Sequence, residues 1–530
     1  MNDGKICVSI REKTTPDLIH SIEKAINFAD IIEIRFDDFD LSGLKNALSK
    51  LKSSKREFKI PLLAALHDTP IKVQIGDLIL PDKFTAWQEI TASHTVNYID
   101  PGEGGVLALI FETWNQVENQ LPHFRPFIEN INKHKLIYSI HNFDGIPQNI
   151  EERYKKIKIP PVELLKIAVQ AKDATDGLTV MKLLERAKTE GWKMIPIAMG
   201  EYGVWTRILG LARGAFMTFA SFDDESTTAP GQLTAQEMID VYRVKELDES
   251  SEIYGLVAGS TAHSVSPAMH NAAFKFHGLN AVYVPFAVNN LSEFMRRMVN
   301  PKTREIEWNL CGFSVTLPHK IDIIQYIDEI DETARQIGAV NTVRIADDGK
   351  LLGFNTDAIG FIEPLKNSYG DLSNANVAVF GAGGAARAVV YALQRERANV
   401  TVFARNLAKA KNLADDFGVA LAELPIQNPK SKIQNQDIVV NATPLGMRKG
   451  GMENETVATA RQLEGVKLVY DLVYNPFETR LMQEASKVFV PTLGGLAMLV
   501  AQAIEQQKIW TNLEAPIKEM SRAALQKLER

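Results

Sequence analysis

The sequence predicts an α/β protein, with an N-terminal (β/α)8 barrel followed by a second α/β region that has a parallel sheet of its own. Three observations lead to this prediction. Strand-like and helix-like segments alternate over roughly the first 240 residues, and the strands are apolar. A short strand, a glycine turn and a helix start follow one another at 377–389. A chain of 530 residues is also too long to fold around a single hydrophobic core, and at about 150 residues per domain it suggests three or four structural units.

The elements of the N-terminal half follow from the spacing of its apolar residues. Short apolar runs indicate buried strands, whereas apolar residues three or four apart, such as Leu18, Ile22 and Ala25, indicate helices. Strands are expected at 5–10, 31–35, 60–66, 96–99, 136–140, 164–169, 194–199 and 216–219, and helices at 15–28, 41–51, 84–93, 121–133, 150–156, 175–190 and 204–211. The segment 106–112 fits either type. A doubly wound sheet is the alternative, but this half has no glycine fingerprint.

Composition narrows the class of protein. Apolar residues make up 45% of the chain and charged residues 23%, as in ordinary globular proteins. The net charge of −6 and the scattered Lys and Arg residues give no field that favours nucleic acid. Cys7 and Cys311 form no C-x-x-C motif, which favours a reducing compartment and disfavours a metal site. With no signal-peptide pattern and no apolar run of about 20 residues, we expect a cytoplasmic enzyme that binds no membrane.

In a barrel of this type, functional side chains lie at the carboxyl ends of the strands. That rule selects Glu33 and Arg35, which alternate with apolar residues and should share one side, and His141. It also selects Lys166, which lies within an apolar strand. Because desolvation favours the neutral amine that imine chemistry needs, Lys166 is a candidate nucleophile. Considered alone, Lys166 could instead be a lysine at a strand edge that reaches solvent, and His141 a hydrogen-bonded structural histidine.

Five motifs together resemble the type I 3-dehydroquinate dehydratase family over residues 5–245. They are Glu33-x-Arg35, Tyr138-Ser-Ile-His141-Asn-Phe, Leu165-Lys166-Ile-Ala, Met199-Gly-x-x-Gly203-x-x-x-Arg207 and Thr228-Ala-Pro-Gly-Gln232. The resemblance implies that Lys166 forms an imine with the substrate ketone and that His141 moves protons. It further implies that Arg207 binds the substrate carboxylate, whereas Glu33, Arg35 and Gln232 hold hydroxyl groups.

The chain departs from the dehydratase pattern at the third strand. The family carries an arginine there, followed by a glutamate and two glycines, whereas this chain has His67 and lacks the glutamate. Histidine is shorter than arginine and only partly charged near neutral pH, so substrate positioning would be altered. Thr228 stands where the family has serine, which is a milder change. A weakened dehydratase is therefore an alternative to an active one.

A polar, acidic stretch at 246–252 is the expected linker to a second functional unit. Hydroxyl groups at a turn before a helix, Ser264 and Ser266, can bind a small anion, although ordinary helix capping explains them too. Lys320 and Asp357 stand on separate glycine-flanked segments and could form a polar dyad. Considered separately, they would be a surface lysine and a helix cap.

Eight motifs in order resemble the shikimate dehydrogenase family over about 253–512. They are Ser264-x-Ser266-Pro, Ser314-Val-Thr316-x-Pro-x-Lys320, Gly338-Ala-Val-Asn341-Thr, Asn355-Thr-Asp357-x-x-Gly, Gly381-Ala-Gly-Gly-Ala385, Asn441-Ala-Thr443-Pro-Leu-Gly-Met, Tyr470-Asp-Leu-Val-Tyr474-Asn-Pro and Gly494-Gly495-Leu-Ala-Met-Leu-Val-Ala-Gln502. The resemblance implies that Ser264, Ser266 and Tyr474 hold the substrate carboxylate and that Thr316, Asn341 and Gln502 contact ring hydroxyls. Lys320 and Asp357 would handle the carbonyl proton. Ser266 favours shikimate over quinate, and Ser314 replaces a frequent asparagine.

The glycine turn at 381–384 predicts a Rossmann subdomain that binds a dinucleotide, because backbone N–H groups at the helix start can hold phosphate. Unliganded glycine turns of this kind also exist. The next strand ends in Ala404, Arg405 and Asn406, with no acid for a ribose hydroxyl. Arg405 can bind a 2′-phosphate, so NADP(H) is the expected cofactor. The candidate cofactor residues are Gly381, Ala382, Gly383, Gly384, Ala385, Ala404, Arg405, Asn406, Lys409, Thr443 and Gly495.

Together these resemblances imply a fused enzyme of the kind known from plants and some bacteria. It would dehydrate 3-dehydroquinate to 3-dehydroshikimate and then reduce that product to shikimate with NADPH, without a metal. The expected domains are a barrel at 1–245, a substrate subdomain at 253–370 completed by helical residues 496–530, and a Rossmann subdomain at 371–495. The alternatives are a dehydrogenase with an inactive barrel, a quinate dehydrogenase, and a regulatory module that binds these ligands without turnover.

Overall fold

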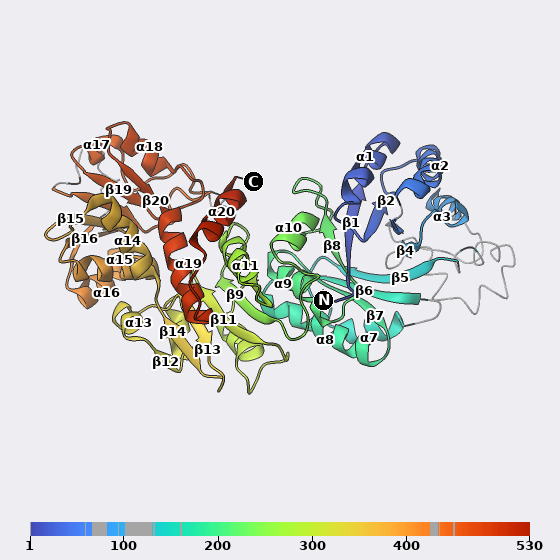
Figure 1. Ribbon diagram of the computed structural model, residues 1–530, viewed down its shortest axis with the longest axis horizontal. Coiled ribbons are helices and arrows are strands. Elements are labelled where there is room, and N and C mark those ends of the chain that lie inside the picture. Colours follow the sequence, from blue (N-terminus) through green and yellow to red (C-terminus); the bar gives the residue numbers. More distant parts are fainter. Residues whose placement is uncertain are drawn as a thin grey trace. The chain divides into compact units, whose positions relative to one another are not determined.

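The computed structural model describes residues 2–58, 60–65, 82–93, 95–100, 130, 133–158, 162–423, 433, 435–448 and 451–529 (Figure 1). Two compact units make up the chain, and we describe each by itself. One unit comprises residues 1–251 with 284–309, and the other comprises 252–283 with 310–530. Within the described residues, no helix has the length and apolar character needed to cross a membrane.

Eight parallel strands form the first sheet, as the sequence predicts. They are β1 (Lys5–Arg11), β2 (Ile31–Arg35), β3 (Leu62–Ala65), β4 (Tyr98–Asp100), β5 (Lys135–Asn142), β6 (Val162–Gln170), β7 (Lys193–Met199) and β8 (Met217–Ser221). Their order is β7-β6-β5-β4-β3-β2-β1-β8. A backbone hydrogen bond of 2.9 Å from Phe216 N to Met194 O brings the start of β8 beside β7, so the sheet curls toward closure.

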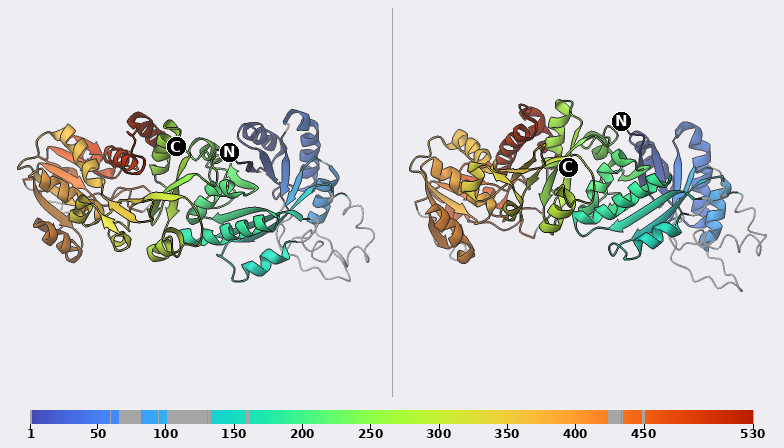
Figure 2. Two further views of the ribbon diagram at one scale, coloured as in Figure 1. Left: turned by 60° about the horizontal axis from the view of Figure 1, so that its bottom comes forward. Right: turned by 90° about the horizontal axis from the view of Figure 1, so that it is seen from below.

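Helices alternate with these strands and cover the outside of the sheet (Figures 1 and 2). The described ones are α1 (Thr15–Ala25), α2 (Leu41–Phe58), α3 (Asp82–Ser93), α7 (Ile150–Lys156), α8 (Gly177–Thr189), α9 (Val204–Leu209) and α10 (Ala235–Asp240). Helix α2 runs seven residues beyond the expected end, and the first extra turn keeps Ser54 buried. Helix α10 was not expected; the Thr234 side chain caps it by accepting from Glu237 N. The helix expected at 121–133 and the segment 106–112 fall mostly or wholly outside the described residues.

The barrel interior is layered, because successive side chains on a strand point to opposite faces. An apolar cluster fills its lower part with Cys7, Ile31, Leu63, Tyr98, Ile137, Leu164, Ile195 and Met217, among others. Two residues further along the same strand faces, polar side chains replace apolar ones at Ser9, Glu33, Asp100, Ser139 and Lys166. The fold therefore sets a buried polar layer on an apolar floor.

Residues 284–309 belong to the same compact unit as the barrel. Trp205 of α9 packs against Trp308 and Phe286, with ring centroids 5.8 and 6.2 Å apart. Asp173 accepts hydrogen bonds from Asn289 N and Asn290 N at 2.7 and 3.0 Å. The short helix α12 (Leu291–Phe294) follows, capped by the Asn290 side chain.

A mixed sheet with the order β10-β9-β11-β13-β14-β12 follows along the chain. Its strands are β9 (Glu252–Ala258), β10 (Ala281–Ala287), β11 (Leu310–Val315), β12 (Glu329–Ile330), β13 (Thr342–Ile345) and β14 (Leu351–Phe354). Strand β13 is antiparallel to both neighbours, β11 and β14. Helices α11 (Ser266–Phe276) and α13 (Glu332–Ile337) belong to this region. Candidate site residues follow β11 and β14 and directly precede β13.

A fully parallel sheet with the order β17-β16-β15-β18-β19-β20 forms the Rossmann region, as predicted. Its strands are β15 (Asn376–Phe380), β16 (Asn399–Ala404), β17 (Ala420–Glu423), β18 (Ile438–Asn441), β19 (Leu468–Asp471) and β20 (Thr492–Gly494), and its helices are α14 (Asp357–Tyr369), α15 (Gly384–Arg395), α16 (Leu407–Phe417), α17 (Ala460–Leu463) and α18 (Arg480–Ser486). Val377 and Val379 face one apolar cluster and Ala378 and Phe380 the other, so both faces of the sheet are buried.

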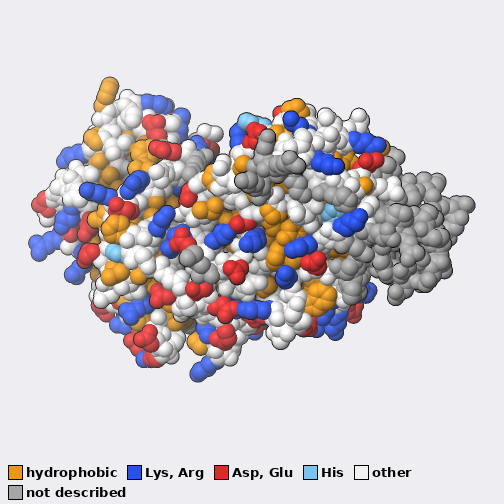
Figure 3. Space-filling model, turned by 45° about the vertical axis from the view of Figure 1, so that its right-hand side comes forward, with side chains coloured by type: hydrophobic (Ala, Val, Ile, Leu, Met, Phe, Trp, Pro, Cys, Tyr) orange, Lys and Arg blue, Asp and Glu red, His pale blue; other side chains and the backbone are white. Residues whose placement is uncertain are grey.

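Two helices end the chain, close to the expected 496–510 and 515–528. Helix α19 (Gly495–Thr511) packs closely on α14, because Gly360 lets it approach: a Cβ there would lie 2.7 Å from Gln502 Cβ. Helix α20 (Ile517–Leu528) buries Met520 and Ala524 in a cluster that also holds Met269 and Ala273 of α11. On the described part of the face in Figure 3, acidic and basic side chains are interspersed, consistent with the small net charge of −6.

Candidate active sites

Five buried polar side chains from five strands meet inside the barrel. Lys166 Nζ on β6 donates to Asp100 Oδ2 on β4 at 2.9 Å and lies 3.9 Å from Glu33 Oε1 on β2. Ser139 donates to Asp100 Oδ1 and Ser9 to Glu33 Oε2, each at 2.6 Å. Both carboxylates therefore have a hydroxyl donor on one oxygen and the ammonium near the other.

The charge of Lys166 differs from the expectation. Burial lowers the pKa of Lys166, but the carboxylates of Asp100 and Glu33 outweigh that effect, so its pKa lies above the ordinary value. The Phe219 ring also lies 4.4 Å from Nζ, where it attracts a cation. The prediction of a neutral resting amine is thus wrong, because sequence inspection did not place two carboxylates beside the lysine.

His141 and Arg35 lie further toward the carboxyl ends of their strands. His141 is two residues beyond Ser139, whose register partner is Lys166, and so it shares the inward side of β5. Its ring stacks nearly parallel to that of Phe143, at 6.4 Å between centroids. Arg35 stands two residues beyond Glu33 and donates from Nε to Asp37 Oδ2 at 2.7 Å. The predicted grouping of Glu33, Arg35, His141 and Lys166 at one end of the barrel is observed.

Arg207 is a buried guanidinium that makes no ion pair with any described carboxylate. Its exposed fraction is 1%, and its Nε has no hydrogen-bond partner in the described structure. Its two terminal nitrogens, Nη1 and Nη2, donate only long hydrogen bonds of 3.4 Å, to the carbonyls of Phe219 and Pro230. Burial lowers the pKa of Arg207 to about 10. An unpaired buried charge is unfavourable in free energy, so an anionic ligand would stabilise this guanidinium.

The predicted loop at 228–232 packs next to Arg207. Gln232 Oε1 accepts from Thr228 N at 2.8 Å, from Thr228 Oγ1 at 3.1 Å and from Ala229 N at 3.3 Å, which ties the loop into a tight turn. Pro230 O accepts a hydrogen bond from Gly200 N at 3.0 Å as well as the one from Arg207. Thr228 and Gln232 are thus brought to the same end of the barrel. His67 lies outside the described residues.

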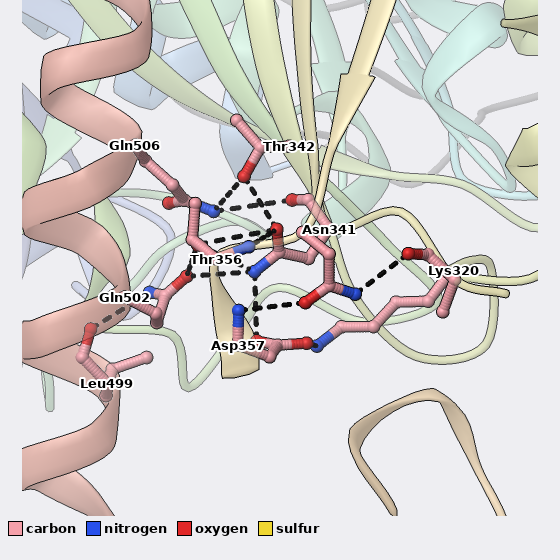
Figure 4. Close-up of polar contacts among 10 residues, drawn as sticks. Lys320, Asn341, Thr342, Thr356, Asp357, Leu499, Gln502 and Gln506 are labelled. Atoms are coloured by element: carbon pink, nitrogen blue, oxygen red, sulfur yellow. Dashed lines mark hydrogen bonds and ion pairs between the residues drawn. The ribbon is translucent and has the colours of Figure 1, made fainter. Parts of the chain in front are cut away.

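A second polar centre joins β11, β13 and α14 in the other unit (Figure 4). Lys320 Nζ donates to Asp357 Oδ2 at 2.5 Å, and Asn341 Nδ2 donates to Asp357 Oδ1 at 2.9 Å. Asp357 is 3% exposed, and its own N–H bonds the Asn355 side chain at 3.0 Å. The Lys320–Asp357 pair predicted from the sequence is formed, and Asn341 binds the other oxygen of the same carboxylate.

Helix α19 holds Asn341 from the opposite side (Figure 4). Gln506 Nε2 donates to Thr342 Oγ1 at 3.0 Å, and that hydroxyl donates to Asn341 Oδ1 at 2.7 Å. Gln502 Oε1 lies 3.4 Å from Asn341 Nδ2, and its amide donates to Leu499 O at 2.9 Å. These contacts fix the rotation of the Asn341 amide and hence the position of Asp357.

The candidate anion-binding residues surround the start of α11. Ser266 N donates to Ser264 Oγ at 3.2 Å, and the Ser266 side chain is buried. Tyr474 hydrogen-bonds Ser264; burial raises the pKa of Tyr474 and this bond partly opposes the rise. Thr316 is half-buried at the end of β11, and its backbone N–H bonds Val257 O at 3.0 Å. Ser314 hydrogen-bonds the buried Tyr283 hydroxyl rather than facing solvent.

The glycine turn lies directly against Lys320 of the Lys320–Asp357 pair. Gly381 has φ +122°, and a Cβ there would meet Ala442 O at 2.9 Å. Gly384 opens α15, and a Cβ there would lie 2.9 Å from Lys320 Cβ. Gly383 differs, because a Cβ would meet no atom within 4 Å. The open space at Gly383 beside the α15 N-terminus fits a phosphate, and Ala382 and Ala385 flank it within the same turn.

The other cofactor candidates lie at the same edge of the sheet. Ala404 is buried at the end of β16, whereas Arg405 and Asn406 are exposed just beyond it. The Lys409 side chain lies outside what the structure describes. Thr443 donates to Asn441 Oδ1 at 2.7 Å, and a Cβ at Gly495 would collide with the Leu472 backbone. An exposed arginine with no acidic residue next to it in the sequence fits a 2′-phosphate, although Glu423 of β17 is the register partner of Ala404.

Sequence reasoning missed several residues of both centres. Asp100 could have been found, since it follows an apolar strand at the barrel's carboxyl edge, but its strand is only three residues long. Ser9, Ser139, Thr342 and Gln506 gave no sequence signal, because hydroxyl and amide side chains are common in strands and helices. Among the described residues, no three His, Cys, Asp or Glu side chains gather as metal ligands would.

Four family descriptions match the chain in succession. Type I 3-dehydroquinase matches residues 6–249, and the shikimate dehydrogenase substrate-binding domain matches 256–343. Shikimate/quinate 5-dehydrogenase matches 363–473, and the shikimate 5'-dehydrogenase C-terminal domain matches 495–525. The matches cover the barrel centre, Lys320, Asn341 and the glycine turn, and Asp357 lies between two matched ranges.

A relative that spans nearly the whole chain agrees with these matches. A bifunctional 3-dehydroquinate dehydratase/shikimate dehydrogenase from Arabidopsis thaliana, described as chloroplastic, is 31% identical across 97% of this chain and 83% of its own length. An NADP(+) shikimate dehydrogenase from Methanocaldococcus jannaschii is 40% identical over 53% of this chain and 99% of its own. A solved shikimate dehydrogenase in complex with NADP+ is 39% identical, with a TM-score of 0.48 over 54% of this chain and 98% of that one.

We predict that Gly384→Ala disturbs Lys320, because the new Cβ would lie 2.9 Å from Lys320 Cβ and 3.2 Å from its Cδ. Moving the lysine by a fraction of an ångström should lower kcat for the reduction about 10- to 100-fold. Gly383→Ala is the matched control, since its Cβ meets no protein atom: it should leave the thermal unfolding temperature unchanged and raise mainly the KM for the dinucleotide. Steady-state kinetics of both variants test this, and equal kcat values would contradict it.

A pH prediction follows from Asp471, which ends β19. Burial raises its pKa to about 6, although Thr479, Val473 and Asn441 all donate to it. The folded state therefore binds this proton more tightly than the unfolded state, so stability from Asp471 is greatest below about pH 4 and falls as the pH rises to about 6, by roughly 3 kcal/mol. We expect denaturant unfolding between pH 4 and 7.5 to show the free energy of unfolding of the wild type falling relative to that of Asp471→Asn as the pH rises.

Asp437→Asn serves as the control of opposite sign. The ion pair with Lys467 lowers the pKa of Asp437, so its contribution appears as the pH rises and is lost as the pH falls. The transition to follow is the one that NADP+ shifts upward, since the cofactor stabilises the unit it binds. A constant difference between wild type and Asp471→Asn would contradict the assignment.

Proposed function

This chain belongs to the family of bifunctional 3-dehydroquinate dehydratase/shikimate dehydrogenases, and we propose that its own residues carry out both reactions. The barrel dehydrates 3-dehydroquinate to 3-dehydroshikimate, and the second unit reduces that product to shikimate with NADPH. The observation that carries the proposal is that each unit holds a lysine paired with a carboxylate and side chains suited to a carboxylate-bearing substrate. Lys166 pairs with Asp100 in the unit that contains the buried Arg207, and Lys320 pairs with Asp357 in the unit that contains Ser264 and Ser266.

In the barrel, Lys166 attacks the substrate ketone and expels water to form an imine. The imine accepts electrons better than the ketone, so His141 can remove the proton alpha to it and later protonate the departing hydroxyl. Arg207 pairs with the substrate carboxylate, which supplies the anion that the buried guanidinium lacks. Glu33, Arg35 and Gln232 position hydroxyl groups, and Thr228 shapes their loop.

In the second unit, Ser264, Ser266 and Tyr474 bind the substrate carboxylate, and Thr316, Asn341 and Gln502 contact the ring hydroxyls. Lys320 places its ammonium at the carbonyl oxygen and delivers the proton there, and Asp357 keeps Lys320 oriented. NADPH supplies the hydride for the carbonyl carbon. The turn at 381–385 and Gly495 hold its phosphates and nicotinamide end, whereas Arg405 with Ala404, Asn406, Lys409 and Thr443 holds the adenosine side.

The domain division that fits these roles is a barrel at 1–245, a substrate subdomain at 253–370 with 496–530, and a Rossmann subdomain at 371–495. The free thiols of Cys7, which is buried, and Cys311, which is half-buried, support our proposal of a reducing compartment such as the cytoplasm.

A weakened dehydratase is the second candidate function for the barrel, because His67 replaces the family's arginine. The intact cluster of Lys166, Glu33, Arg207 and His141 favours an active site nonetheless. Quinate reduction is disfavoured, since Ser266 occupies the place that a smaller residue would leave open for the extra quinate hydroxyl.

We predict that sodium borohydride will trap 3-dehydroquinate on Lys166. Full-length enzyme should gain the mass of one reduced substrate on a peptide that contains Lys166, and Lys166→Ala should lose both the label and the dehydration. Reduction of 3-dehydroshikimate by the same variant should stay unchanged, because that reaction uses the other unit. If the wild-type chain dehydrates substrate without labelling, the imine mechanism is wrong. If it neither labels nor dehydrates, the weakened barrel is the correct function.

Cofactor preference tests the role of Arg405. Arg405→Ala removes the side chain proposed for the 2′-phosphate, so the KM for NADPH should rise about 10- to 100-fold, the loss of one or two charge-assisted hydrogen bonds. The KM for NADH, which has no such phosphate, should change little. Arg397→Ala, a change of another arginine on the same sheet's connecting loops, is the control. Equal effects on both cofactors would show that Arg405 does not read the phosphate.

A further inference from the structure

Asp100 is the group in direct contact with the reacting amine of the barrel. Its side chain is fully buried, and Oδ2 accepts from Lys166 Nζ at 2.9 Å. Ser139, the register partner of Lys166, donates to the other oxygen at 2.6 Å. One carboxylate oxygen is thus held by a neutral hydroxyl while the second points at the nitrogen. This is the geometry of a base that takes a proton from the amine.

Glu33 is less suited to that task. Its nearer oxygen is 3.9 Å from Lys166 Nζ, beyond hydrogen-bond distance, and its other oxygen is occupied by Ser9. Cys7 and Arg35 also face the amine; the Cys7 thiol is kept neutral because burial raises its pKa, and Arg35 bears no lone pair. Asp100 thus combines a short contact to the amine with a basic atom.

We propose that Asp100 is a catalytic residue that takes protons from Lys166 and passes them to the oxygen that leaves as water during imine formation. This inference rests on the imine function proposed above. The resting ammonium, with three N–H bonds, gives one proton to Asp100, and the neutral amine attacks the ketone carbon. Asp100 protonates the resulting alkoxide, removes a second proton from nitrogen and returns it to the hydroxyl, which departs as water. The iminium keeps one N–H bond, and the total charge is unchanged.

The pocket explains why the transfer can occur so far from solvent. Proton movement from ammonium to carboxylate converts a buried ion pair into a neutral pair, so the net charge of the polar layer stays the same. The carboxylates beside Lys166 favour its protonated form, so the amine needs an acceptor for that proton before it can attack. Ser139 keeps the acceptor in place, and Glu33 remains as counter-ion for the iminium.

A merely structural counter-ion would behave differently on mutation, which makes the proposal testable. Asp100→Asn keeps the shape and the bond with Ser139 but removes the base and a negative charge. If Asp100 only held the charge of Lys166, the amine would be neutral more often in the variant and borohydride labelling would be as fast or faster. If Asp100 moves protons, labelling at pH 7 should slow about 100-fold or more.

The experiment measures the rate of borohydride labelling of Lys166 by 3-dehydroquinate in full-length wild type and Asp100→Asn from pH 6 to 10. We expect slow labelling in the variant that rises with pH, because hydroxide then replaces the base. Labelling at the wild-type rate would overturn the inference while leaving the imine function intact. No labelling in wild type would instead overturn the imine function itself. Asp100→Glu is the second variant if asparagine prevents folding of the barrel: it keeps a carboxylate, so labelling within about tenfold of wild type is expected, and complete loss in a folded chain would overturn the inference.

Discussion

Charged and polar atoms can lie inside a barrel only when each one has a partner. That constraint organises the first unit: an ammonium, two carboxylates and two hydroxyl groups satisfy one another above an apolar floor. Five strands each contribute one member, so the arrangement exists only in the closed sheet. Arg207, with no described anion, is the exception, and its missing partner has the chemistry of the substrate.

The same constraint acts in the second unit through an amide rather than a charge. Asn341 donates to Asp357 and Thr356 and accepts from Thr342 and the Thr356 backbone. Gln506 on α19 fixes that network from behind, so a helix near the end of the chain helps to orient a dyad whose lysine lies 186 residues earlier (506 − 320). Helix α19 therefore helps to orient this polar centre and does not only cover it.

Much of this could be predicted from the sequence, because strand periodicity and glycine chemistry are local. The eight barrel strands, the parallel Rossmann sheet and the Lys320–Asp357 dyad were expected. The charge state of Lys166 was not, since it depends on Asp100, 66 residues away and on a three-residue strand. Helix α10 was missed for a similar reason: the Thr234 side-chain cap, rather than propensity, sets its start.

The contact between Gly384 and Lys320 has a consequence for how this enzyme can change. Gly384, in the turn that would bind a dinucleotide, is in van der Waals contact with Lys320, the lysine that would protonate the substrate. Substitution at Gly384 therefore cannot retune cofactor binding without moving the proton donor, whereas Gly383 has no such contact. The exposed end of β16 at Arg405 has no such contact with the lysine among those observed, so selection can alter cofactor choice there while the chemistry is preserved. Two neighbouring parts of one binding site thus differ sharply in their freedom to evolve.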